Sequence, residues 1–173
     1  MPKNIDALLP TIYEDLKRLA RIQRKRVYSK KSLGTRSIVH EAYINIVKSK
    51  TEIENKNQLL YLTSIAMRNI IIDNARAWHS KKRGGGNHDI PLEQISLVSV
   101  QRNSELLALD DALIKLSKQN PRMVEIVNCR FFGGLTLTET AEALNISVAT
   151  IKRDWALAKV ILFQKLSIDN NQS

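Results

Sequence analysis

Apolar residues recur at the three-to-four-residue spacing of an amphipathic helix through most of this chain, and the residues that break helices lie between those stretches. The spacing is clearest from Ile38 to Val47 and from Leu59 to Ala75. Aromatic residues make up only 5% of the sequence, and the few glycines and prolines are clustered. The pattern predicts an all-α protein, and an apolar content of 43% over 173 residues is enough for a packed core.

A change in composition divides the chain into two parts. Residues 84–103 begin with the run Gly84 to Gly86, are rich in glycine, asparagine, proline and serine, and have weak apolar periodicity. We interpret them as a flexible linker between two small helical domains, an N-terminal helical bundle at 1–83 and a C-terminal domain at 104–173. Helices are expected up to about residue 27, from Thr35 or Ser37 to a polar loop at 49–56, from that loop to Arg83, and over 104–118, 121–132, 137–144 and 148–166.

The charge of the chain is positive and unevenly distributed. Residues 1–83 carry 18 basic and 7 acidic side chains, whereas residues 104–173 carry 8 of each. The formal net charge of +10 favours a polyanionic partner, either nucleic acid or an anionic membrane surface. The single cysteine, Cys129, cannot form an internal disulfide, and no signal peptide or long apolar span is evident. We therefore expect a cytoplasmic protein without membrane insertion.

The segment from Thr136 to Arg153 has the features of a helix-turn-helix. Thr136 and Glu139 have the spacing of a capping box, which predicts a helix start. Ala141 is small enough for two helices to cross closely, and Asn145 tolerates a left-handed turn. A second helix follows, and its cap and first turns can reach base edges and phosphates through Ser147, Val148, Ala149, Thr150, Lys152 and Arg153. An ordinary helical hairpin with the same spacing is the alternative.

Three segments resemble, in order, parts of the extracytoplasmic-function sigma factors of bacteria. The run FFGGLTLTETAEALNISVATIKRDWALAK, which starts at Phe131, is similar to their C-terminal domain, with Asn145 in place of a common glycine and Ile151 in place of a common valine. The run SIVHEAY at 37–43 resembles the family's DLVQETF segment, although Ser37 and His40 replace Asp and Gln. The run MRNIIID at 67–73 resembles the family's ARNxxID segment.

The resemblance implies a sigma factor that binds core RNA polymerase and promoter DNA and directs the initiation of transcription. It also implies no enzyme activity and no cofactor, and it makes an anti-sigma factor a candidate partner. The polymerase-binding residues that it implies are Ile38, Val39, Glu41 and Tyr43. The residues of the N-terminal domain that it places near the minus-ten element are Arg68, Asn69, Arg76, Trp78, Lys81, Lys82 and Arg83. The helix from Val148 would read the minus-thirty-five element.

Two side chains of the N-terminal domain have both a functional and a structural interpretation. Tyr61 and Trp78 are candidates for stacking on a base freed from the duplex. The loop Ser49 to Gln58 lies where the family captures such a base. Burial of both aromatic rings against the apolar stripe of their helix is the alternative.

Two other classes of protein are alternatives to a sigma factor. A stand-alone repressor or activator would also need the helix-turn-helix, but it would not need the segment that resembles the polymerase-docking surface. An enzyme acting on nucleic acid is disfavoured, because the three histidines lack metal-ligand spacing and the glycine run lacks the lysine and hydroxyl of a phosphate loop. We expect no catalytic residues and no metal ligands, and we expect Cys129 to be a small core residue.

Overall fold

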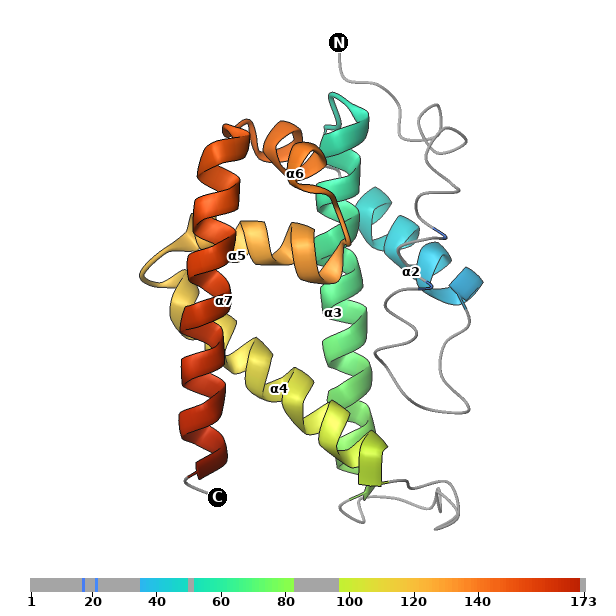
Figure 1. Cartoon of the computed structure of the whole chain (residues 1–173). Coiled ribbons are helices and arrows are strands. Elements are labelled where there is room, and N and C mark those ends of the chain that lie inside the picture. The colour runs from blue at the N-terminus through green and yellow to red at the C-terminus, as the bar shows by residue number, and fades with distance from the viewer. Residues whose placement is uncertain (1–16, 18–20, 22–34, 50–51, 83–96, 172–173) are drawn as a thin grey trace.

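The computed structural model describes residues 17, 21, 35–49, 52–82 and 97–171, and every regular element in these ranges is a helix (Figure 1). The all-α prediction is therefore confirmed. Among these helices, none combines the length and the apolar character that crossing a membrane requires. The elements are α2 (Thr35–Lys48), α3 (Lys56–Lys82), α4 (Leu97–Ser117), α5 (Pro121–Val127), η2 (Asn128–Phe132), α6 (Leu137–Leu144) and α7 (Val148–Asn171).

Some helix boundaries differ from the expected ones. Helix α4 begins at Leu97, inside the stretch interpreted as linker, because residues 97–103 contain no glycine or proline to stop it. The rest of that stretch, 84–96, lies outside the described residues, as does most of the helix expected before residue 27. Helix α7 continues to Asn171 rather than ending at Leu166.

The stretch expected as one helix from Pro121 to Phe132 is helical throughout but changes type. Asn120 caps it as predicted, because its side chain accepts a hydrogen bond from Met123 N at 3.1 Å. From Asn128 onward the helix widens into the π-helical turn η2, where Gly133 N donates to Asn128 O at 2.9 Å.

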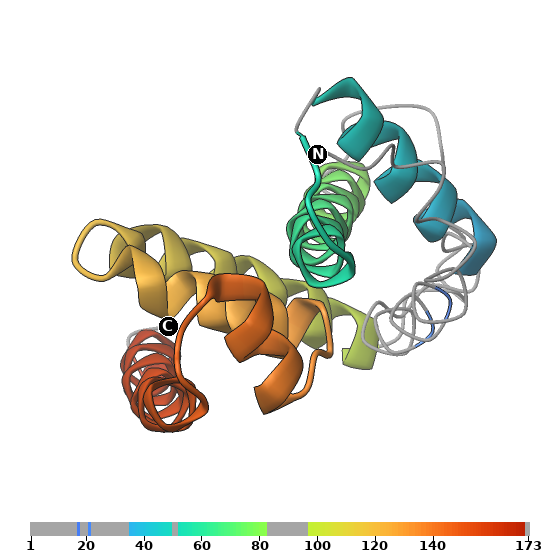
Figure 2. The same ribbon diagram turned by 90° about the horizontal axis from the view of Figure 1, so that it is seen from above.

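Helix α3 lies at the centre of the arrangement. Helix α2 packs on one side of it, and α4, η2 and α6 pack on the other (Figures 1 and 2). Helix α7 completes the C-terminal part of the molecule by packing on α4, α5 and α6. The two halves of the chain pack together along α3.

The hydrophobic core is shared between α3 and the C-terminal helices. One cluster of buried side chains joins α2 and α3 with Cys129 of η2 and with Leu135. A second cluster joins Ile71 and Ile72 of α3 with residues of α4, α5, η2 and α7. Contacts of this kind exclude water from apolar surface on both halves, so they stabilise the packed arrangement.

Candidate nucleic-acid interface

Helix α6 starts and ends as its sequence predicts. Thr136 Oγ1 accepts a hydrogen bond from Glu139 N at 3.1 Å, and Glu139 Oε2 accepts one from Thr136 N at 2.8 Å. These two bonds form the capping box. The helix ends at Asn145, which is left-handed with φ 54° and ψ 48°. The turn is closed by Ile146 N, which donates to Ala141 O at 3.0 Å.

Helices α6 and α7 are held together by a small core. Ala141 of α6 and Ile151 of α7 are buried against Ile126 of α5. Side chains packed around these three are Leu137, Leu144, Ile146 and Trp155. The predicted helix-turn-helix packing is confirmed, and α5 is the third helix that supports it.

The first turns of α7 are capped at one end and open to solvent on one face. Ser147 Oγ accepts a hydrogen bond from Thr150 N at 3.3 Å and donates one to Thr150 Oγ1 at 2.9 Å. Val148 is 43% exposed, and Lys152 and Arg153 are exposed as well. Ala149 is exposed beside them. All the residues that the sequence assigned to this helix therefore lie together at its N-terminal end.

The acidic residue in the first turns of this helix points away from the open face. The carboxylate of Asp154 is buried, and its Oδ2 accepts hydrogen bonds from Arg122 Nη2 at 2.6 Å and Arg122 Nε at 3.0 Å. Its Oδ1 accepts a longer bond, of 3.3 Å, from Arg153 Nε. Because Arg122 lies on α5, this ion pair ties the open helix to its support and compensates the buried negative charge.

Trp155 packs into the domain, as its spacing from Ile151 favours. Its ring is partly buried, and Arg130 Cζ and Lys159 Nζ each lie 5.4 Å from the ring centroid. Cation-π contacts of this length hold the two cations against the aromatic face.

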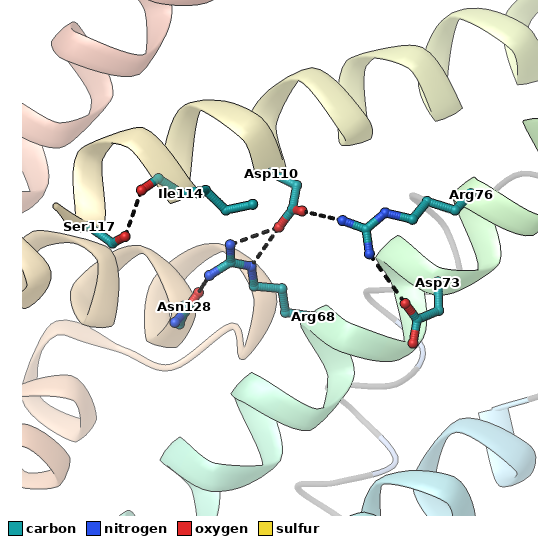
Figure 3. A network of polar contacts seen from close by, with 7 residues as sticks. All are labelled: Arg68, Asp73, Arg76, Asp110, Ile114, Ser117 and Asn128. Atoms are coloured by element: carbon teal, nitrogen blue, oxygen red, sulfur yellow. Dashed lines mark hydrogen bonds and ion pairs between the residues drawn. The ribbon is translucent and has the colours of Figure 1, made fainter.

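Arg68 of α3 was expected at the DNA surface, and the structure turns it toward α4 and η2 instead. Its Nη2 and Nε donate to Asp110 Oδ1 at 2.7 and 3.2 Å, and its Nη1 donates to Asn128 Oδ1 at 3.0 Å (Figure 3). Its Cζ lies 5.8 Å from the ring centroid of Phe132. A carboxylate, an amide and an aromatic face thus surround a side chain that is only 14% exposed.

The other residues expected to face DNA on α3 have different environments. Arg76 is half exposed, and its Nη2 lies 3.0 Å from Asp110 Oδ2 while its Nη1 lies 3.5 Å from Asp73 (Figure 3). Asn69 is exposed. Helix α3 extends to Lys82. The side chains of Trp78, Lys81 and Lys82 lie outside the described part of the chain, and so does the whole of Arg83.

The residues expected to bind polymerase are divided between core and surface. Val39 is only 5% exposed and belongs to the core cluster of α2 and α3, so its side chain holds the helix in place and does not present a docking surface. Glu41 is exposed and Tyr43 is partly buried. The side chain of Ile38 lies outside the description. The structure places Val39 in the core, where the apolar periodicity marks a buried position, and its assignment to polymerase binding stays a prediction.

Tyr61 is partly buried, which agrees with the structural interpretation of this ring. Its hydroxyl donates to Glu125 Oε1 of α5 at 3.2 Å. Burial, followed by the nearby Glu125 carboxylate, raises the pKa of Tyr61 above its usual range. The ring therefore joins α3 to α5 in this arrangement and is not free to stack on a base.

Cys129 is a buried core residue, as predicted. Burial, together with the charge of Glu125, raises the pKa of this thiol to about 12. Within the described part of the chain, no three side chains of His, Cys, Asp or Glu form a group that could hold a metal ion.

The model of the ECF sigma factor family matches residues 2–168. Neither the comparison with curated proteins nor that with solved structures found a match. Because the match includes both halves of the chain, the protein belongs to the ECF sigma factors, which bind core RNA polymerase and direct promoter recognition without catalysing a reaction themselves.

Proposed function

We propose that the first turns of α7 read the minus-thirty-five element of the promoter in the major groove of duplex DNA. The N-terminal domain at 1–83 docks on core polymerase and contacts the minus-ten element. The observation that carries the proposal is the face at the start of α7, which is open to solvent while its opposite side is locked into α5 and α6. A major groove admits an α-helix presented in this way.

The side chains on this face can make the contacts that sequence reading requires. Lys152 and Arg153 can bind phosphates or the acceptor atoms of guanine. The exposed Val148 and Ala149 are apolar and can contact a thymine methyl group. The hydroxyl of Ser147 is already used to cap the helix.

The charge distribution supports the same face. Asp154 is the acidic residue of the early turns of α7, and its carboxylate is buried against Arg122 rather than exposed beside Lys152. The side chain of Arg122 remains 47% exposed, so it adds positive charge near the helix. An anionic phosphate that approaches α7 therefore meets cations and no exposed carboxylate of these turns.

The assignment of the N-terminal domain follows from the family resemblance. Glu41 on α2 and Asn69 on α3 are exposed expected contact residues of the two matched segments, and His40 and Asp73 of the same segments are exposed as well. Val39 acts indirectly, by holding α2 on α3. We assign polymerase docking to the exposed face of α2 around Glu41.

Run-off transcription with purified core polymerase on genomic fragments tests the proposal. The wild-type chain should direct transcripts from a subset of fragments, and absence of a transcript from every fragment would contradict it. On a responsive fragment, Arg153→Ala should weaken promoter binding by about 1 to 3 kcal/mol without changing the affinity for polymerase. Lys165→Ala is the matched control, because it removes one positive charge about 20 Å further along the same helix.

A further inference from the structure

A line of polar contacts runs along α3 and joins it to each of the neighbouring C-terminal helices. Near its start, Asn57 Nδ2 donates to Glu142 Oε2 of α6 at 2.6 Å. One turn later, Tyr61 bonds to Glu125 of α5. Arg68 and Arg76 follow on the same helix and bond to α4. These contacts lie between residues that are 34 to 85 positions apart in the chain.

Asp110 of α4 is the point at which two arginines of α3 converge. Its Oδ1 accepts from Arg68 Nη2 at 2.7 Å, and its Oδ2 accepts from Arg76 Nη2 at 3.0 Å (Figure 3). The carboxylate is 8% exposed. Two guanidinium groups that hold one small anion by several N–H donors form the kind of site that also binds a phosphate.

The apolar packing around this ion pair is close enough to hold the two halves of the chain together. An added Cβ on Gly133, at the end of η2, would lie 1.9 Å from Ser64 Oγ of α3. Cys129 and Leu135 lie in the same core cluster as residues of α2 and α3. The face of α3 that carries Arg68 is therefore covered by C-terminal helices.

We propose that Asp110 occupies, on Arg68 and Arg76, the place that a backbone phosphate of promoter DNA takes during initiation. The free chain then rests in a closed arrangement, in which its own carboxylate fills the anion site of the N-terminal domain. Separation of α4 and η2 from α3 exposes the site, and a phosphate replaces Asp110. The inference rests on the proposed function, because it keeps Arg68 and Arg76 as DNA-binding residues.

The closed arrangement makes DNA binding conditional. An anion in solution must compete with a carboxylate that is already positioned and largely desolvated. A partner can shift this equilibrium only by the difference between its affinities for the open and closed arrangements. Core polymerase and promoter DNA together provide that difference in affinity if each of them binds a surface that is covered in the closed arrangement. The free chain should consequently bind promoter DNA weakly.

The reactivity of Cys129, the single thiol of the chain, reports the separation of α4 and η2 from α3 directly. Cys129 lies in the cluster shared with α2 and α3, so its reaction with a thiol reagent at constant pH requires this interface to open. Asp110→Asn keeps the shape of the side chain and removes its charge. We expect the Asp110→Asn substitution to increase the rate of Cys129 labelling in the native state about tenfold, because the Arg68 guanidinium loses its counter-charge. Asp111→Asn is the control, since Asp111 is the next residue of α4 and is exposed.

The same variants separate opening from simple unfolding. Asp110→Asn should raise the affinity of the free chain for promoter DNA about tenfold, whereas unfolding would lower it. Faster labelling with tighter DNA binding supports the closed arrangement. Labelling at the rate of the Asp111→Asn chain overturns it, as does faster labelling with unchanged or weaker DNA binding.

A reversible cross-link tests the inference without disturbing the ion pair. Cysteines introduced as Asn57→Cys and Glu142→Cys can be joined by a short bismaleimide that contains a cleavable disulfide. The cross-linked chain should lose run-off transcription with core polymerase and regain it on reduction. Transcription that the cross-link leaves unchanged overturns the closed arrangement. Absence of transcription even after reduction, and from the wild-type chain, would instead contradict the proposed function.

Discussion

Asp154 of α7 and Arg122 of α5 form an ion pair with two hydrogen bonds to one carboxylate oxygen, and the pair fixes the DNA-reading helix to the helix behind it. Arg122 Nη2 and Nε lie 2.6 and 3.0 Å from Asp154 Oδ2, and the Asp154 side chain is only 6% exposed. The pair positions α7 from the side opposite its open face.

Arg122→Met should lower the free energy of unfolding by about 1 to 3 kcal/mol, because Asp154 would remain buried with only the longer bond from Arg153. Urea unfolding measures the change. Lys118→Met, which removes an equal charge from an exposed position in the preceding turn, is the control. Equal losses in the two variants would show that the ion pair does not fix α7.

Thr136→Ala should destabilise the chain by about 1 kcal/mol, because the capping box at the start of α6 loses the hydroxyl that accepts from Glu139 N. Thr138→Ala is the matched control, since Thr138 is exposed and lies in the first turn of the same helix. Thermal unfolding of both variants checks the difference. A cost at position 138 as large as that at 136 would contradict the role of the cap.

Gly133→Ala should cost about 1 to 3 kcal/mol, because the new Cβ would overlap Ser64 Oγ across the interface between η2 and α3. The cost should be smaller in a Ser64→Ala background, where that oxygen is absent. Contacts of 2.8 Å to Cys129 O and to Leu135 remain in both backgrounds, so the relief is partial. A double-mutant cycle measures the coupling, and zero coupling would mean that the two residues do not meet in solution.

The stabilising effect of Cys129 should decrease above pH 9. Its pKa is raised from 9.0 to about 12 in the folded chain, so between these values the unfolded chain loses the thiol proton and the folded chain keeps it. Alkaline pH therefore favours unfolding through this group. The difference in unfolding free energy between wild type and Cys129→Ala should shrink from pH 8 to pH 10.5. A difference that stays constant would mean that the thiol is not shielded.

The helix-turn-helix was predictable because its signals are local. The capping box of Thr136 and Glu139 and the left-handed Asn145 depend on residues within a few positions of one another, and Ala141 and Ile151 follow from helical spacing. Such short-range rules specify where a helix begins, where it ends and which face it buries.

The environment of Arg68 was not predictable in the same way. A basic residue in a segment that resembles a DNA-facing helix is naturally assigned to DNA, and its partner Asp110 lies 42 residues away. No local pattern selects that carboxylate among the acidic residues of α4. Likewise, periodicity placed Val39 on the apolar face of its helix. Whether that face packs in the core or binds a partner depends on how α2 lies on α3.

Directed cleavage of promoter DNA from α7 tests the central assignment most directly. A cysteine introduced as Ala156→Cys, about one turn beyond Arg153 and exposed, can carry an iron chelate that cleaves nearby DNA, while the native Cys129 is buried. In the complex with core polymerase, one cluster of cuts should fall in the duplex around the minus-thirty-five element. Cuts confined to the minus-ten region, or none above the level of the unmodified chain, would contradict the account.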